Sequence, residues 1–166
     1  MQHYTRMNGT LPLYQAKLAA PFAVLGVRTV GESLTGIDYL PSGVATLAPQ
    51  TAFAKEVCRQ LRAYLDHSDF CFDLRFELVG SEFQCRVWSA IRQIPCGETL
   101  SYAAVAAKIQ SAPRPIGSAC GANRIPLLIP CHRVVASHGI GGFMHSRAGA
   151  PINIKRWLLQ HERARS

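Results

Sequence analysis

The sequence predicts an α/β protein with two parts: a small N-terminal sheet domain over residues 1–80 and a mainly α-helical C-terminal domain over residues 81–166. Three observations predict this division. Short apolar runs separated by turn residues fill the first part, a helix-capping signal begins the second, and two helical stretches around a proline-containing turn follow. With 166 residues, 48% of them hydrophobic, the chain is long enough to bury a core in one or two domains.

Strands are expected first, within residues 14–40, where Pro21 and Gly31 interrupt short apolar runs. Residues 51–68 carry apolar residues at a spacing of four, which predicts one amphipathic helix with the stripe Phe53, Val57, Leu61 and Leu65. Residues 71–79 alternate between apolar and polar, which predicts another strand. Polar groups do not gather into a site anywhere in this domain, so we expect it to act as a scaffold.

The second domain is expected to begin with a helix. Ser81 and Gln84 have the spacing of a capping box, in which each side chain bonds the backbone N–H of the other residue. The residues that follow place one apolar face on the helix, formed by Phe83, Val87, Ile91 and Ile94. Pro95 and Gly97 end it.

A helix, a turn and a second helix come next. Ser101 is a suitable N-cap for a helix from Tyr102 to Ile109, and two prolines then interrupt it. Pro115 can occupy the first position of the next helix. This order is typical of the helix-turn-helix of DNA-binding proteins. The second helix is rich in small residues, so it could either approach a groove of DNA closely or pack tightly inside the fold.

Positive charge is concentrated in the second half. Residues 1–83 carry seven Lys or Arg against eight Asp or Glu, whereas residues 84–166 carry eleven against two, and the whole chain has a formal net charge of +8. The competing interpretation is a basic protein without an anionic partner. Because all of the excess lies in one half, contact with nucleic acid is favoured.

The cysteines do not have the spacing of a disulfide framework or a metal site, because no two are closer than eleven positions. No metal is therefore expected at Cys58, Cys71, Cys85, Cys96, Cys120 or Cys131. Apolar runs of the ~20 residues that cross a membrane are also missing, as is a secretion signal at the N-terminus. We expect a cytoplasmic protein with reduced thiols.

One cysteine stands out because of its neighbours. Cys131 is followed by His132 and comes after an apolar run. A cysteine reacts as the thiolate, and an imidazole is a common means of forming it. A carboxylate such as Glu162, in the last expected helix, would complete a relay. The two neighbours could be linked directly or through a water molecule, and for such a pair alone a structural role is the competing interpretation.

Three motifs give a more specific interpretation: SEFQCRVWSAIRQIPCGETLSYAAVA, PRPIGSACGANRIPLLIPCHRVV and KRWLLQHE. In these motifs, over residues 81–135 and 155–162, the chain resembles the O6-alkylguanine-DNA alkyltransferases, also called methylated-DNA–protein-cysteine methyltransferases. The first 80 residues resemble the family more loosely. The resemblance implies a ribonuclease-H-like N-terminal domain and a C-terminal domain like a winged helix-turn-helix. It also implies repair of duplex DNA by irreversible, stoichiometric transfer of an alkyl group from O6-alkylguanine to the protein's own cysteine, with no cofactor.

The resemblance implies roles for individual residues. Cys131 matches the nucleophile, and His132 with Glu162 matches the relay that acts on it through water. Tyr102 matches the tyrosine that assists protonation of the departing guanine, and Asn123 matches the asparagine that orders the loop around the site.

Further positions match residues that face the DNA. Lys155 resembles a lysine near the leaving base, and Arg114 matches the arginine that fills the gap left by the extruded nucleotide, a task suited to a long planar cation. Other DNA contacts are expected on and beside the same helix, from Pro115, Gly117, Ser118, Ala119 and Ser101.

The chain also departs from the family. Pro115 stands where the family usually has a small residue, and the segment between Phe143 and Lys155 is longer than is common. The longer segment leaves a lesion-binding relative that flips the base without transfer as an alternative, although such relatives lack the cysteine. A redox or metal-binding thiol protein is a third hypothesis. Duplex DNA is the expected partner, O4-alkylthymine is a further candidate substrate, and neither a membrane nor an obligate protein partner is expected.

Overall fold

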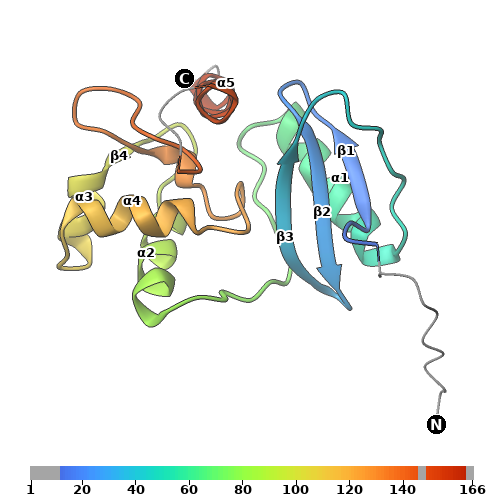
Figure 1. Ribbon diagram of the computed structural model, residues 1–166, viewed down its shortest axis with the longest axis horizontal. Coiled ribbons are helices and arrows are strands. Elements are labelled where there is room, and N and C mark those ends of the chain that lie inside the picture. Colours follow the sequence, from blue (N-terminus) through green and yellow to red (C-terminus); the bar gives the residue numbers. More distant parts are fainter. Residues whose placement is uncertain (1–11, 146–148, 164–166) are drawn as a thin grey trace, which may run out of the picture.

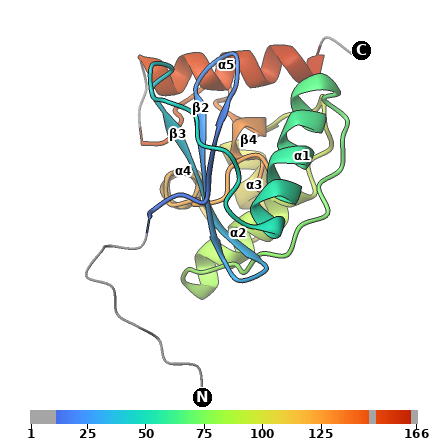
Figure 2. The same ribbon diagram turned by 90° about the vertical axis from the view of Figure 1, so that its right-hand side faces the viewer.

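The computed structural model describes residues 12–145 and 149–163, which form a sheet-containing half and a helical half (Figure 1). The elements of the first half are β1 (Ala16–Ala19), β2 (Val24–Val30), β3 (Ser33–Leu40) and α1 (Ala52–Asp66). The three strands form an antiparallel sheet in the order β1-β2-β3, and α1 covers one of its faces (Figure 2). The expected α/β class and the strands within residues 14–40 are confirmed.

The turns of the sheet lie where the sequence predicts them. Val30 pairs with Ser33, so two residues connect β2 to β3, and the first of them, Gly31, has φ of +57°. This left-handed conformation is one that glycine adopts without strain. The turn between β1 and β2 spans Pro21 and is closed by a bond from the Ala20 N–H to the Ala23 carbonyl (2.9 Å).

Helix α1 is confirmed, with its apolar face rotated from the predicted stripe. Thr51 caps it by accepting a hydrogen bond from the Ala54 N–H at 3.0 Å. Val57 and Leu61 are fully buried, whereas Phe53 and Leu65, at the two ends of the stripe, are only half-buried. Four further residues complete the buried face: Ala54, Cys58, Gln60 and Tyr64.

The strand predicted for residues 71–79 is wrong. This segment is extended and half-buries alternate side chains, but it makes only one bridge to the sheet, between Leu34 and Phe76. The Gln60 side chain of α1 bonds both the N–H and the carbonyl of Asp73, at 2.8 and 2.9 Å. The Gln60 side chain thus takes the place of a neighbouring strand. The alternation of apolar and polar residues in this segment reflects which side chains face the core, not pairing in a sheet.

The second half contains α2 (Glu82–Arg92), β4 (Leu100–Ser101), α3 (Tyr102–Lys108), α4 (Pro113–Gly121), the 3-10 helix η1 (Cys131–Arg133), β5 (Val134–Val135) and α5 (Ala150–Arg163). The capping box of α2 is confirmed by bonds in both directions between Ser81 and Gln84, at 2.9 and 3.1 Å. Ser101 caps α3 as predicted. The short parallel pair of β4 and β5 was not predicted, and it places the start of α3 beside the chain that follows η1.

Helix α4 begins two residues earlier than the sequence predicts, at Pro113 and not at Pro115. The first N–H groups of a helix have no partner within the helix, so proline is tolerated throughout the first turn. Both prolines therefore belong to α4, and Arg114 projects from its first turn.

Helix α5 lies at the junction of the two halves, where Figure 1 shows it end-on, and contacts both of them. The Trp157 ring packs against Phe22 beside the sheet, with the ring centroids 4.7 Å apart. The His161 Nε2 atom donates to the Tyr64 carbonyl of α1 at 2.8 Å. The buried residues of both halves form one hydrophobic core. Within residues 12–145 and 149–163, no helix is long and apolar enough to cross a membrane.

The capping box of α2 gives a test of this half. Ser81→Ala should lower the free energy of unfolding by about 1 kcal/mol, because an N–H at the start of α2 loses its acceptor. Urea unfolding monitored by circular dichroism measures this change. Ser42→Ala, at an exposed turn, is the matched control and should change stability little. Equal effects of the two substitutions would contradict the capping role.

Candidate active site

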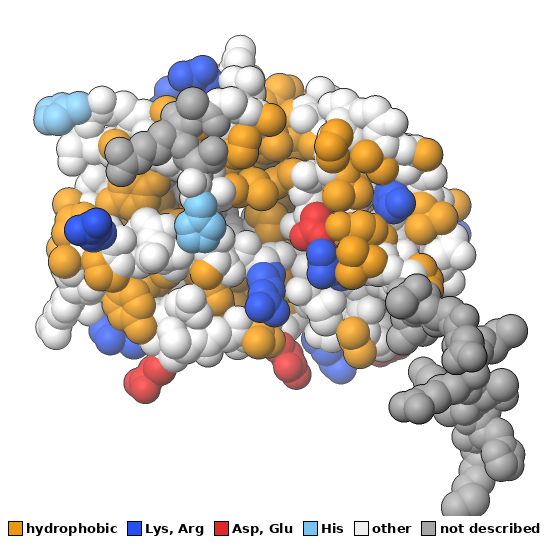
Figure 3. Space-filling view, in the orientation of Figure 1, with side chains coloured by type: hydrophobic (Ala, Val, Ile, Leu, Met, Phe, Trp, Pro, Cys, Tyr) orange, Lys and Arg blue, Asp and Glu red, His pale blue; other side chains and the backbone are white. Residues whose placement is uncertain are grey.

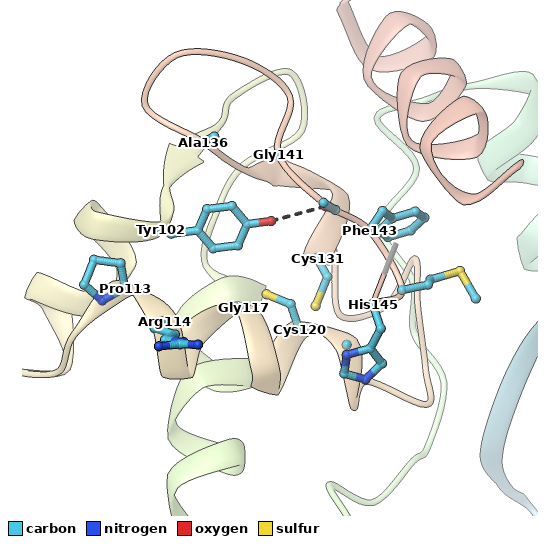
Figure 4. Close-up of a pocket in the computed structure, with 13 residues that line it drawn as sticks. Tyr102, Pro113, Arg114, Gly117, Cys120, Cys131, Ala136, Gly141, Phe143 and His145 are labelled. Atoms are coloured by element: carbon cyan, nitrogen blue, oxygen red, sulfur yellow. Dashed lines mark hydrogen bonds between the residues drawn. The ribbon is translucent and has the colours of Figure 1, made fainter. Parts of the chain in front are cut away.

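Cys131 lies at the wall of a pocket of about 720 Å³ between α3, α4 and the chain that follows β5 (Figure 4). Binding pockets for small organic groups commonly have volumes of about 300–1,000 Å³. The lining includes Tyr102, Arg114, Cys120, Phe143 and His145. Figure 3 shows that the same side of the molecule is hollowed near its centre, where hydrophobic side chains gather. The residue Cys131 is only 4% exposed, so a reaction partner must enter the pocket to reach its sulfur.

The backbone around Cys131 is fixed by short-range bonds. The Arg133 N–H donates to the Pro130 carbonyl at 2.9 Å and closes the turn of η1. Asn123, just after α4, donates from Nδ2 to the Ile129 carbonyl (2.9 Å) and to the Cys131 sulfur (3.2 Å). Its Oδ1 atom accepts from the Ile125 N–H at 2.9 Å. One amide side chain therefore ties the preceding loop to the thiol.

His132 is buried and held in one tautomer. Its Nε2 atom lies 2.8 Å from Oε1 of Glu162, and both side chains are 1% exposed. Burial lowers the pKa of His132, and the hydrogen bond to Glu162, which acts in the opposite direction, does not offset it. The imidazole is thus neutral at pH 7. Because a carboxylate only accepts, Nε2 carries the proton and Nδ1 is the basic nitrogen.

Glu162 is the acceptor on which several buried donors converge. Arg133 binds it through Nε (3.0 Å to Oε2) and Nη2 (2.8 Å to Oε1), and the Tyr64 hydroxyl donates at 3.0 Å. Burial by itself raises the pKa of Glu162, but the hydrogen bonds from His132 and Arg133 outweigh it and lower the pKa to about 2. The carboxylate is therefore ionised throughout the physiological range.

The Cys131 thiol lies in an environment that opposes its ionisation. A hydrogen bond with the Cys120 side chain and burial both raise its pKa, while the bond from Asn123 and the positive charge of Lys155 act in the opposite direction. The resting group is therefore the thiol, and a base must remove its proton before the sulfur can react. A direct bond between Cys131 and His132 is not found, so the relay needs a bridging group.

Lys155 is completely buried and fixes the chain that closes the pocket. Its Nζ atom donates to the Val134 carbonyl of β5 at 2.6 Å and to the Gly142 carbonyl at 2.9 Å. Burial lowers its pKa to about 8, against the attraction of the two nearby sulfurs. Lys155 thus supplies positive charge near Cys131 and holds residue 142 against the strand.

Tyr102 reaches across the pocket from the first turn of α3 and donates to the Gly142 carbonyl at 3.2 Å (Figure 4). Gly141 makes this approach possible. It has φ of +75°, and a Cβ atom at this position would lie 2.9 Å from the Tyr102 ring and 3.0 Å from the Ala136 backbone nitrogen. A larger residue would therefore disturb the wall of the pocket.

Helix α4 presents a mixed face. Arg114, Pro115 and Ser118 are exposed, and Gly117 is half-buried. Ala119 is 2% exposed, and its carbonyl accepts a hydrogen bond from the Trp88 indole at 2.9 Å. Ala119 therefore packs into the core and is withdrawn from the expected DNA contacts, because a buried methyl group cannot reach DNA.

Ser101 also has a role within the fold. Its hydroxyl accepts the hydrogen bond from the Ala104 N–H at 3.0 Å that caps α3. Its backbone pairs with Val135, so Ser101 holds the first turn of α3 against the chain that follows η1.

Three residues of the site were missed from the sequence. Cys120 lies beside Cys131, Tyr64 binds Glu162, and the buried Tyr39 hydroxyl lies near enough to Cys131 that a thiolate there would add to the effect of burial and raise the pKa of Tyr39. The only signal for Cys120 was its position in the predicted second helix. The sequence carried no signal for Tyr64 or Tyr39, because both lie in the sheet-containing half, far from Cys131 along the chain. Within the described part of the chain, no group of three or more metal-ligating His, Cys, Asp or Glu side chains exists.

Comparisons with known proteins agree on one family. The model of a family described as 6-O-methylguanine DNA methyltransferase, DNA binding domain, matches residues 82–164. The methylated-DNA–protein-cysteine methyltransferase of Methanosarcina mazei is 39% identical over 113 residues, which are 66% of this chain and 68% of that protein. The protein of the same name from Mycobacterium tuberculosis is 35% identical over 162 residues, or 93% of this chain and 94% of that protein.

A solved structure is similar over most of the chain. The crystal structure of Mycobacterium tuberculosis OGT in complex with DNA superposes with a TM-score of 0.73 at 36% identity, over 90% of this chain and 92% of that chain. The similarity therefore extends through the sheet-containing half, where the sequence motifs are weakest.

The Glu162 cluster predicts a specific acid sensitivity. The folded-state pKa of about 2 lies below the ordinary value of 4.5, so the carboxylate stabilises the fold above pH 4.5 and this contribution is lost as the pH falls toward 2. Its size is on the order of 3 kcal/mol. Glu162→Gln should remove this part of the pH dependence. It should also lower the free energy of unfolding at neutral pH by about 3–5 kcal/mol, because Arg133 loses its counter-ion.

Urea unfolding at a series of pH values measures both effects. Glu98→Gln, at an exposed glutamate of the same half, is the control, and its free energy of unfolding should depend on pH as that of the unmodified protein does. If Glu162→Gln kept the acid dependence of the unmodified protein, the ionised buried carboxylate would be ruled out.

Proposed function

Because the chain belongs to the family of O6-methylguanine-DNA methyltransferases, we propose that Cys131 is the sulfur that accepts the alkyl group. The protein acts in DNA repair: it transfers the alkyl group directly from O6-alkylguanine in DNA to one of its own cysteines. The observation that supports Cys131 is its position: Cys131 lines the pocket, and the next residue of η1 is His132, which is paired with Glu162. A nucleobase that enters the pocket can therefore reach the sulfur, and the His132 imidazole of the same turn can serve as the proton acceptor.

The proposed reaction starts with removal of the thiol proton. His132 takes this proton on Nδ1 through a bridging water molecule, and Glu162 stabilises the imidazolium that results. The Cys131 thiolate attacks the alkyl carbon, a carbon–sulfur bond forms, and the bond from that carbon to the guanine oxygen breaks. The Tyr102 hydroxyl assists protonation of the departing guanine. A thioether remains on the protein, and because a thiolate is a poor leaving group from its carbon, each molecule acts once.

The substrate base has to leave the duplex, since an alkyl group inside the base stack cannot reach a buried sulfur. We propose that the exposed first turn of α4 enters the minor groove and that Arg114 fills the gap left by the extruded nucleotide. Pro115, Gly117 and Ser118 would then face the DNA backbone. Lys155 holds the chain that covers the base through its bonds to Val134 and Gly142.

The finer features of the architecture belong to the same proposal. Helices α3 and α4 would form the core of a winged helix-turn-helix, and the sheet with α1 a ribonuclease-H-like domain. The boundary would lie at residues 80–81, just before the capping box of α2. A cytoplasmic location beside the nucleoid suits a DNA substrate and thiols that must stay reduced. Binding without transfer is not favoured, because the acceptor cysteine is present.

The acceptor is tested by intact-mass measurement after incubation with a duplex that contains O6-methylguanine. The protein should gain the mass of one methylene group, located by peptide mapping at Cys131. Cys131→Ser should lose this gain completely while it still binds the duplex. Cys71→Ser, at an exposed cysteine away from the pocket, should gain the mass in full. A methyl group found on a different residue would show that the acceptor is misassigned.

The role of Arg114 is tested by single-turnover rates. Arg114→Ala should slow transfer from a duplex by about tenfold to a hundredfold, because the wedge offsets a few kcal/mol of unstacking. Transfer from a single-stranded oligonucleotide, which needs no wedge, should change little. Arg62→Ala, at an exposed cation of α1, is the control for net charge. Equal slowing on both substrates would exclude a wedge and indicate a contact to the phosphate backbone.

A further inference from the structure

A second cysteine, Cys120, lies next to the alkyl acceptor. Cys120 comes from α4 and Cys131 from η1, and in Figure 4 both sulfurs point into the same open space. Both residues line the main pocket, and both also line a second cavity of about 370 Å³ that faces Ile37 and Asp38 of β3. The two thiols can therefore be reached from two sides by a molecule that is much smaller than a nucleobase.

The remaining cysteines have different surroundings. Cys71, Cys85 and Cys96 direct their sulfurs toward backbone carbonyls, and Cys58 is buried in the core. All six are free thiols in this structure. Cys120 and Cys131, in contrast, interact with each other through their side chains. This interaction lowers the pKa of Cys120 and raises that of Cys131, so Cys120 is the more readily ionised of the two.

From this juxtaposition we propose that Cys120 is an oxidation site: with hydrogen peroxide as oxidant, it forms a reversible disulfide with Cys131. The Cys120 thiolate attacks the peroxide, so that a sulfur–oxygen bond forms, the oxygen–oxygen bond breaks and hydroxide leaves. The Cys131 sulfur then attacks the sulfenic sulfur. The disulfide bond forms, the sulfur–oxygen bond breaks, and water leaves with the Cys131 proton. Peroxide is reduced by two electrons, and the two thiols supply them.

The consequence rests on the proposed function, in which Cys131 is the acceptor. A disulfide blocks alkyl transfer for as long as it lasts, but it keeps the acceptor from further oxidation to sulfinic and sulfonic acids, which thiols do not reverse. A protein that acts once and cannot renew its acceptor would thus keep its capacity for repair through a period of oxidation.

The full chain is treated with hydrogen peroxide, its remaining thiols are blocked, and it is digested without reductant for mass analysis. The unmodified protein should yield a peptide pair that joins Cys120 to Cys131 and is lighter by two hydrogen atoms than the two separate peptides. Dithiothreitol should then restore methyl transfer from a duplex that contains O6-methylguanine. In the Cys120→Ser variant, Cys131 should instead gain one to three oxygen atoms. After dithiothreitol, the peroxide-treated variant should transfer less methyl than the same variant that was never treated with peroxide.

Cys71→Ser is the matched control, because it removes an exposed thiol and should leave the cross-link unchanged. The proposal would be overturned if no cross-link formed, if Cys131 paired with a different cysteine, or if Cys120→Ser recovered as fully as the unmodified protein. The cross-link in the unmodified protein is read by mass alone, so it does not depend on the folding of a variant. Untreated protein that failed to gain a methyl group would refute the proposed function and leave the disulfide measurement intact.

Discussion

The fold and the site both depend on one buried carboxylate, that of Glu162. It accepts hydrogen bonds from Tyr64 of α1 and from His132 and Arg133 of η1, and thus connects the last helix with both halves of the chain. A charge at this depth is stable only with partners that compensate for its lost hydration, and Arg133 supplies the opposite charge. The same interaction decides which nitrogen of His132 carries the proton. Structure and reactivity therefore cannot be separated at this residue.

The site reconciles two opposed requirements of the Cys131 sulfur. Burial protects the thiol and favours its neutral form, whereas attack on an alkyl carbon needs the thiolate. Two groups favour the thiolate: His132, a base that is neutral at pH 7 and oriented by Glu162, and the buried Lys155, whose positive charge lies near the sulfur. The resting sulfur is held as the thiol, and it attacks an alkyl carbon once the relay has taken its proton. Because Cys120 lies next to it, the same sulfur can also enter the proposed disulfide.

Local signals in the sequence predicted the helices well, because capping boxes and apolar stripes act within a few residues. The predicted strand at residues 71–79 failed because a strand also needs a neighbour, and Gln60 takes that place through its side chain. Cys131, His132 and Glu162 could be named from their chemistry and from the family motifs. Tyr64, Tyr39 and Cys120 could not, because their contribution comes from tertiary contacts between distant segments. The expected DNA contact of Ala119 failed for a related reason. Small residues suit both a DNA groove and a protein core, and the packing of Trp88 against Ala119 could not be read from the sequence.

The protonation state of His132 tests this account most directly. Long-range proton–nitrogen NMR correlations of the ¹⁵N-labelled protein, with His132 assigned by its substitution, report which ring nitrogen carries the proton and where it titrates. We predict the neutral form protonated at Nε2, with a pKa below the ordinary value of about 6.5. A proton on Nδ1, or a pKa above that value, would contradict the relay and with it the proposed activation of Cys131.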